Sequence, residues 1–261
     1  MGINNIVFSI IGSAINKKNY KRCYNYIKNT DVSFEMIFVG SHPPTEFIGE
    51  HFNYIYSTVK PAQCIEIGAR MSQGEYIIPT YDDCYFSENF LDNLWEQIQK
   101  IDTTQYLLSF YSYPGFYNGE PNLKLWKKVA PLDLNYFGIK VGECCCFPRE
   151  VWTKLGGIDR RFIWSFPIVD LQLRCFEIGL ILQFVPNIYV QEIYERIIPE
   201  KKNEYDKNKL SVKYGDYDRR MLYFFWNDVY GGFSPKRRLP VESFNNGNIK
   251  TVTQGEKGEW N

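Results

Sequence analysis

The chain has 261 residues, with 30 basic and 30 acidic side chains and a formal net charge of zero. This length suits one large α/β domain, and the neutral balance argues against a nucleic-acid partner, which a basic face would attract. No apolar run reaches the ~18 residues that a membrane-spanning helix needs, and the N-terminus lacks the features of a signal peptide. The 7 cysteines include no CxxC pair and are typical of reduced, buried thiols. We therefore expect a cytoplasmic protein without a transmembrane segment.

The first hundred residues alternate between short apolar runs and helical patterns. The apolar runs predict buried strands at Ile6–Ile11, Phe34–Val39 and Tyr54–Tyr56, and a fourth that ends at Asp82 and Asp83. Apolar residues at helical spacing predict helices at Lys17–Lys28, Pro61–Ser72 and Glu88–Lys100. This alternation predicts a mostly parallel sheet with helices on both faces.

The second half is less regular. Apolar runs predict strands at Gln105–Tyr113, Glu143–Phe147, Leu180–Val185 and Ile188–Ile193. Helices are expected at Arg149–Leu155, where Gly156 and Gly157 supply a C-terminal cap, and at Val169–Ile178. Beyond them, the charged segment 200–213 and the aromatic segment 217–229 predict a helical extension over about 200–230, followed by a polar tail over 233–261.

Two adjacent acids, Asp82 and Asp83, end the apolar strand in GEYIIPTYDDCYF (Gly74–Phe86). Ligands of open α/β sheets bind outside the carboxyl ends of the strands. Neighbouring carboxylates repel each other by roughly 1 kcal/mol at ~4 Å in water, and a divalent cation removes this cost. Because Mg²⁺ is typically held by one or two carboxylates plus substrate phosphates, the pair predicts a metal–diphosphate site. The alternative is a solvated turn or a helix N-cap, both of which favour Asp.

The order of these segments resembles the family 2 glycosyltransferases, which have the GT-A fold. The resemblance is most specific in IGARMSQGEYIIPTYDDCYFSENFL (Ile67–Leu91) and in FPREVWTKLGGIDRRF (Phe147–Phe162) with the VDLQLRCFEIGLILQFVP that follows. It covers roughly residues 5–190. It implies a Rossmann-like, mostly parallel central sheet flanked by helices, in a single domain over 1–232. A nucleotide-sugar half would occupy about 1–100 and an acceptor half about 101–195, before the C-terminal extension.

The resemblance also implies a UDP- or GDP-sugar donor, Mn²⁺ or Mg²⁺, and a glycan-type hydroxyl acceptor. Asp83 would contact the metal, and Asp82 the metal or the ribose. Many members carry a histidine near the end of the acceptor half; VPNIYVQEIYE has none, and Glu192 is the replacement ligand that we consider. The residues expected to contact the nucleotide or its phosphates are Ser13, Ala14, Gly40, Ser41 and Arg70. The alternative for Arg70 is an ordinary surface arginine.

The general base is where the sequence departs most from the family pattern. The usual Glu-Asp pair is replaced by Pro167 and Ile168, neither of which takes a proton. Asp170 and Asp159 are the nearest candidates, with helix capping as the alternative role. An inverting glycosyltransferase is favoured over a retaining one. The alternative function is a catalytically silent domain of the same fold that binds nucleotide or glycan.

Two further hypotheses concern other classes. A sugar-phosphate nucleotidylyltransferase is disfavoured because GSAINKK, after the first strand, lacks the Gly-rich loop that holds a triphosphate. The aromatic segment Tyr217–Trp226 would suit a peripheral membrane contact or a dimer face, although ordinary packing onto the domain is favoured.

Overall fold

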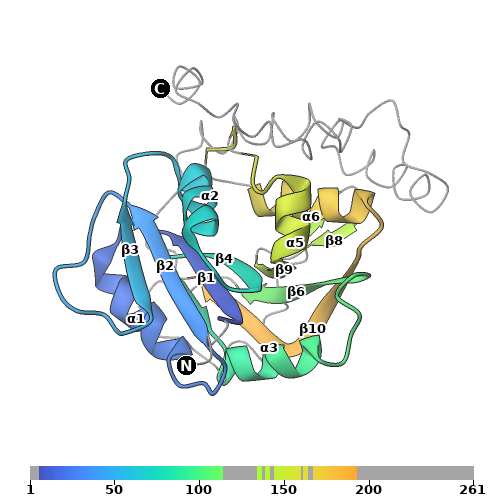
Figure 1. Cartoon of the computed structure of the whole chain (residues 1–261), viewed down its shortest axis with the longest axis horizontal. Coiled ribbons are helices and arrows are strands. Elements are labelled where there is room, and N and C mark those ends of the chain that lie inside the picture. The colour runs from blue at the N-terminus through green and yellow to red at the C-terminus, as the bar shows by residue number, and fades with distance from the viewer. Residues whose placement is uncertain are drawn as a thin grey trace.

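The computed structural model describes residues 6–113, 134–136, 139–141, 144–159, 161–163 and 167–192. Strands and helices alternate through its first half as the sequence predicts (Figure 1). These elements are β1 (Phe8–Ser13), α1 (Lys17–Ile27), β2 (Phe34–Gly40), β3 (Phe52–Tyr56), α2 (Pro61–Met71), β4 (Tyr76–Tyr81), β5 (Cys84–Phe86) and α3 (Phe90–Ile98). The second half contributes β6 (Tyr106–Tyr113), β7 (Leu134–Tyr136), β8 (Ile139–Val141), β9 (Cys145–Pro148), α5 (Arg149–Leu155), α6 (Pro167–Glu177) and β10 (Ile181–Glu192).

In the described part of the chain, one 8-stranded sheet runs in the order β3-β2-β1-β4-β9-β6-β10-β5, and β7 pairs with β8 in a separate ribbon. Strands β1 to β4 are parallel to one another. Strand β9 is antiparallel to its neighbours β4 and β6, and β5 is antiparallel to β10. The predicted fold class, a mostly parallel sheet flanked by helices, is therefore confirmed.

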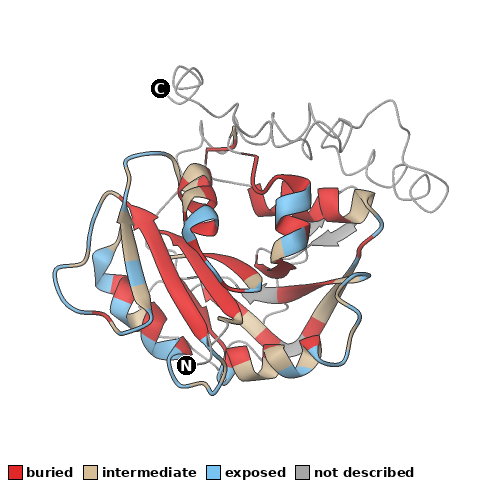
Figure 2. Cartoon of the chain, viewed as in Figure 1, coloured by how far each residue is buried: buried red, intermediate tan, exposed pale blue. Residues whose placement is uncertain are grey.

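The core lies on both faces of the sheet, because successive side chains of each strand point to opposite faces. In β2, Met36 and Phe38 join an apolar cluster that α1 and α3 complete. Ile37 and Val39 join a second cluster, which α2, α5 and α6 complete. Both faces of β1 and β2 are buried (Figure 2), and this explains why these strands read as continuous apolar runs.

Four features of the strands were not predicted. Strand β5 was missed because it has only 3 residues. The ribbon β7–β8 was missed as well, and the antiparallel direction of β9 depends on its distant partners. The two strands expected near 180 and 188 are a single strand, β10, whose register on β6 shifts between Phe184 and Tyr189. Pro186 lies in this interval, and proline has no N–H to donate to a ladder.

None of the helices in the described part of the chain combines the length and apolar character needed to cross a bilayer. The helical extension over 200–230, the aromatic segment and the polar tail lie outside the described residues.

Candidate nucleotide and metal site

The strand order places two loops at the point where ligands bind in open α/β sheets. In the order β3-β2-β1-β4, the chain passes from β1 to one side of the sheet and returns to form β4 on the other side. The carboxyl ends of β1 and β4 therefore flank a topological switch point, where such sheets bind ligands. Residues 14–16 follow β1, and Asp82 with Asp83 forms the turn that follows β4.

Asp82 connects these two loops directly. Its Oδ2 atom accepts a hydrogen bond from the backbone N–H of Ile15 at 2.7 Å and a second from the backbone N–H of Asn16. Asn16 is the N-cap residue of α1 and makes no side-chain cap of its own. The buried carboxylate, 8% exposed, therefore satisfies amides at the positive end of the helix dipole.

The main chain of the acid turn is held from α1 as well. The Cys23 thiol donates to the carbonyl oxygens of Asp82 and Cys84, both at 3.1 Å. Burial is the main cause that raises the pKa of Cys23 well above its usual value, so the thiol keeps the proton that it donates. Asp83 lies between these two anchored residues and is half-buried.

The residues expected to line a nucleotide pocket do lie at this edge, but most of them are covered. Ser13 is 9% exposed and Ala14 is 2% exposed, and the Ala14 N–H donates to the Val39 carbonyl of β2 at 2.9 Å. Gly40 is glycine because a Cβ there would overlap the Ala14 carbonyl. These three residues close the edge between β1 and β2, which leaves Ser41 as the more accessible member of the predicted set.

Next to Ser41, the backbone of His42 is clamped by two tyrosines. The Tyr54 hydroxyl accepts from the His42 N–H at 2.9 Å, and the Tyr20 hydroxyl donates to the His42 carbonyl at 2.9 Å. The exposed imidazole lies 2.9 Å from the Ser41 hydroxyl, between Nδ1 and Oγ. The backbone of His42 is thus held at the edge where β2 ends.

Arg70 is not placed for the predicted phosphate contact. It lies in the last turn of α2, at the end that leads into β4, whereas the acids follow the opposite end of β4. Its Nε pairs with Glu66 Oε1 at 2.8 Å. The sequence alone gives the separation of Arg70 from the acids along the chain, but the direction of α2 decides the distance in space.

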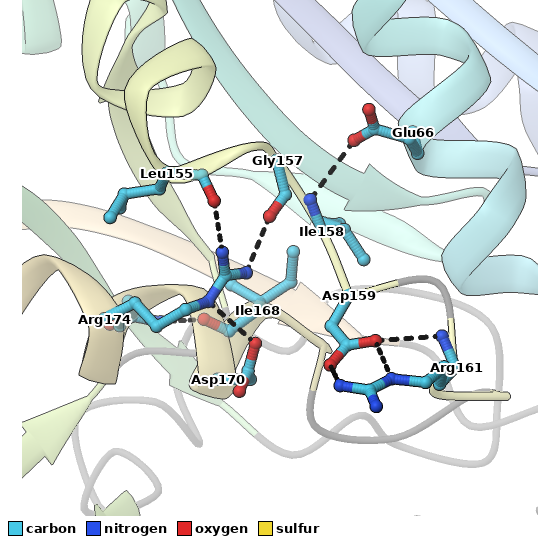
Figure 3. Close-up of polar contacts among 10 residues, drawn as sticks. Glu66, Leu155, Gly157, Ile158, Asp159, Arg161, Ile168, Asp170 and Arg174 are labelled. Atoms are coloured by element: carbon cyan, nitrogen blue, oxygen red, sulfur yellow. Dashed lines mark hydrogen bonds and ion pairs between the residues drawn. The ribbon is translucent and has the colours of Figure 1, made fainter. Parts of the chain in front are cut away.

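Glu66 and Arg174 hold the loop at Gly156 and Gly157, which follows α5, and neither was predicted to act there (Figure 3). Glu66 is 3% exposed, and its Oε2 accepts from the Ile158 N–H at 3.1 Å. Arg174 is 1% exposed and donates to the carbonyls of Leu155 at 2.7 Å and Gly157 at 2.6 Å. No local pattern marks this glutamate or this arginine, because only the fold shows what covers them.

The two candidate bases differ in their surroundings. Asp170 is fully buried within α6 and pairs with Arg174 Nε at 3.0 Å, so the structure places it in the support of this loop. Asp159 follows the loop and is 8% exposed. It pairs with the Arg161 guanidinium through Nη2 at 2.8 Å and Nε at 3.0 Å.

The described residues fit a metal that is shared with a diphosphate. They contain no cluster of three or more His, Cys, Asp or Glu side chains that would hold an ion alone. The register of β10 on β5 places Glu192 opposite Cys84, beside Asp83, so the backbone brings the predicted metal positions to one edge. One or two carboxylates completed by phosphate oxygens match the usual coordination of Mg²⁺.

Comparison with known proteins identifies the architecture. No family model matches the sequence, and no curated protein matches it either. Among solved structures, the chain is similar to GalNAc-T7 with UDP, GalNAc and Mn²⁺, with 14% identity and a TM-score of 0.59, over 95% of this chain and 55% of that one. It is also similar to S. aureus TarS, with 10% identity and a TM-score of 0.56, over 98% of this chain and 47% of that one.

A shorter form of S. aureus TarS, residues 1–349 in complex with UDP-GlcNAc, matches with 15% identity and a TM-score of 0.56, over 98% of this chain and 78% of that one. The chain thus spans about half the length of GalNAc-T7 and of the longer TarS. These likenesses show that the chain has the GT-A fold.

Proposed function

We propose that this protein is a glycosyltransferase that moves a sugar from a nucleoside diphosphate sugar to a hydroxyl acceptor. The observation that carries the proposal is the acid turn Asp82–Asp83 at the switch point of a GT-A sheet. Fold alone would not decide the function. A carboxylate beside the β1 loop, at the edge where ligands bind, matches the way in which a metal-bound diphosphate is held.

The donor that we propose is a UDP-sugar, since GalNAc-T7 and TarS were both solved with UDP or a UDP-sugar. Asp83 would hold Mn²⁺ or Mg²⁺ together with the diphosphate, and Glu192, which is opposite Cys84 in the strand register, is the assisting ligand in this proposal. Such a cation neutralises the charge that develops on the leaving diphosphate. Ser41 and His42 lie where β2 ends and are proposed to contact the nucleoside.

The acceptor side lacks the Glu-Asp pair that the family pattern would supply. With Pro167 and Ile168 at the usual positions and Asp170 in a buried ion pair, Asp159 is the base that we propose. Its pair with Arg161 must open before it takes a proton. A silent domain that binds the nucleotide without turnover is the second candidate, and it rests on this same observation.

Calorimetric titration tests the proposal. UDP, GDP, CDP and dTDP are titrated, each with Mn²⁺ and with EDTA. We expect UDP to bind at least ~10-fold more tightly with Mn²⁺, because the cation joins the diphosphate to Asp83. Asp83→Asn should remove this gain. Asp31→Asn is the matched control, because Asp31 is an exposed acid that precedes β2 at the other end of the strands. If no nucleotide binds with either addition, the proposed function is wrong.

Turnover separates the enzyme from the silent domain. Release of UDP from UDP-GlcNAc or UDP-GalNAc, followed in the presence of candidate acceptors, identifies an enzyme. Nuclear magnetic resonance of the anomeric proton in the product then distinguishes inversion from retention. Tight, metal-dependent binding without any turnover would favour the silent domain.

A further inference from the structure

The two acids of the turn differ in how the fold holds them. Each carboxylate oxygen has about two lone-pair positions, and both positions on Asp82 Oδ2 are used by the N–H groups of Ile15 and Asn16. Coordination of a cation through both oxygens of Asp82 would break these bonds and remove the acid from the α1 N-terminus. Asp83 is the more exposed of the two acids, so its carboxylate is the better placed to meet a ligand that arrives from solvent.

The β1 loop is fixed on both sides by these contacts. On one side, the Ala14 N–H donates to the β2 carbonyl of Val39. On the other, Asp82 holds the next two amides. The half-buried residues Ile15 and Asn16 are therefore the part of the loop that faces outward at the switch point, and Asp82 determines where they lie.

Helix α1 also contacts the main chain of the turn that carries the two acids. Cys23, on α1, donates to the carbonyls on either side of Asp83, while the amides at the start of α1 bind the Asp82 side chain. The loop after β1 and the turn after β4 are thereby locked together across the switch point, although 67 residues separate Ile15 from Asp82.

We propose that the two acids have different roles. Asp82 is a positioning residue that anchors the nucleotide loop at residues 15–16, whereas Asp83 is the acid that contacts the metal. This inference rests on the proposed function. It predicts that an uncharged acceptor at position 82 suffices, because an amide oxygen accepts the same two N–H groups, whereas replacing a carboxylate ligand of a cation by a neutral amide weakens cation binding.

The test compares Asp82→Asn and Asp82→Ala with Asp83→Asn. Titrations of UDP with Mn²⁺ and with EDTA give the affinity and its gain from metal. We expect the UDP affinity of Asp82→Asn, and the gain in that affinity from Mn²⁺, to stay within about threefold of the wild-type values. Asp82→Ala should weaken UDP binding at least ~10-fold, in proportion with and without metal, because the amides of Ile15 and Asn16 lose the acceptor that fixes the loop. Asp83→Asn should lose the metal gain.

Amide hydrogen exchange of the unliganded protein gives a readout that is independent of activity and of metal. In Asp82→Ala, exchange at Ile15 and Asn16 should become at least ~10-fold faster, with wild-type protection retained in Asp82→Asn and Asp83→Asn. Protection in the central strand β1 checks that each variant is folded.

Two results would overturn the proposal. Loss of the metal gain in Asp82→Asn would make Asp82 a metal ligand. Faster exchange in Asp82→Ala with unchanged UDP affinity would leave Asp82 a purely structural cap. If the wild type binds no nucleotide, the proposed function fails, and the exchange data alone then show whether the anchor exists.

Discussion

Gly157 illustrates how a single residue is fixed by what surrounds it. Its φ of +73° lies in the left-handed region, which costs a residue with a Cβ about 1–2 kcal/mol. A Cβ there would also overlap Glu66 Oε2 and approach Trp152 Nε1 to 2.8 Å. Gly179 has a similar φ of +93°, but a Cβ added to it would meet no other atom within 4 Å.

These two glycines make a matched pair of substitutions. We expect Gly179→Ala to lower the free energy of unfolding by about 1–2 kcal/mol, from backbone strain alone. Gly157→Ala should cost about 3–5 kcal/mol, because Glu66 must also move and release the Ile158 N–H. Urea unfolding followed by tryptophan fluorescence measures both. Equal losses of unfolding free energy in the two variants would mean that Glu66 moves aside at no energetic cost, and therefore that it does not hold the loop.

At the scale of elements, the buried pair Asp170–Arg174 connects α6 to the end of α5. Arg174 donates to two carbonyls at this end, Leu155 and Gly157, and so supplies partners that a helix C-terminus otherwise lacks. Asp170 holds the guanidinium in place from one turn earlier. Asp170 therefore has a structural role, and an experiment can distinguish this role from that of a general base.

Asp170→Asn distinguishes these two roles. Since it leaves a buried guanidinium without its counter-charge, we expect a loss of about 3–5 kcal/mol in the free energy of unfolding. Turnover per folded molecule should change less than about threefold. Glu46→Gln is the control: it breaks the exposed pair with Lys21, whose side chains are 51% and 58% exposed, and should cost less than about 1 kcal/mol. A ~10²-fold drop in turnover without loss of stability would restore Asp170 as the base.

At the scale of the whole molecule, the cysteines make stability sensitive to alkaline pH. All 7 are free and buried, as the sequence indicates. Burial raises the pKa of the Cys64 thiol to about 12. It is also the main cause that raises the pKa of Cys23, Cys145, Cys146 and Cys175. For Cys84, a hydrogen bond with Cys144 raises the pKa most, followed by burial.

The sign of the effect follows from the direction of these shifts. The folded chain keeps thiol protons that the unfolded chain loses above its ordinary cysteine pKa of about 8.5. The stabilising contribution is therefore complete below about pH 8.5 and is lost as the pH rises toward the folded values. Each thiol removes about 1.4 kcal/mol per pH unit, so six such groups exhaust a typical domain stability within roughly one to two units.

Urea unfolding at pH 7, 8, 9 and 10 checks this prediction. We expect constant stability up to about pH 8 and a steep fall above pH 9. Cys64→Ala serves as the control, because it should reduce the slope of the unfolding free energy against pH by the contribution of one thiol. A flat profile through pH 10 would show that the buried thiols do not control alkaline stability.

Much of the fold was predictable because its signals are local. Apolar runs in strands that are buried on both faces and the 3.6-residue period in helices are properties of neighbouring residues, so β1, β2, α1, α2 and α5 were found within one or two residues of their bounds. The Gly156 cap is equally local, with a φ of +79° at the end of α5. The short strand β5 was missed because 3 residues are too few for any period to show.

The sequence by itself also located the acid turn, because an apolar strand that stops at two acids is written in consecutive residues. Only the tertiary structure decided what each acid contacts. The partners of Asp82 lie 66 and 67 residues away in the chain, and the buried setting of Asp170 depends on the packing of α6 against α5. The direction of α2 likewise moved Arg70 away from the acids. Local sequence sets which segments form, whereas hydrogen-bond partners and burial are set by which segments meet, and that is a property of the folded chain.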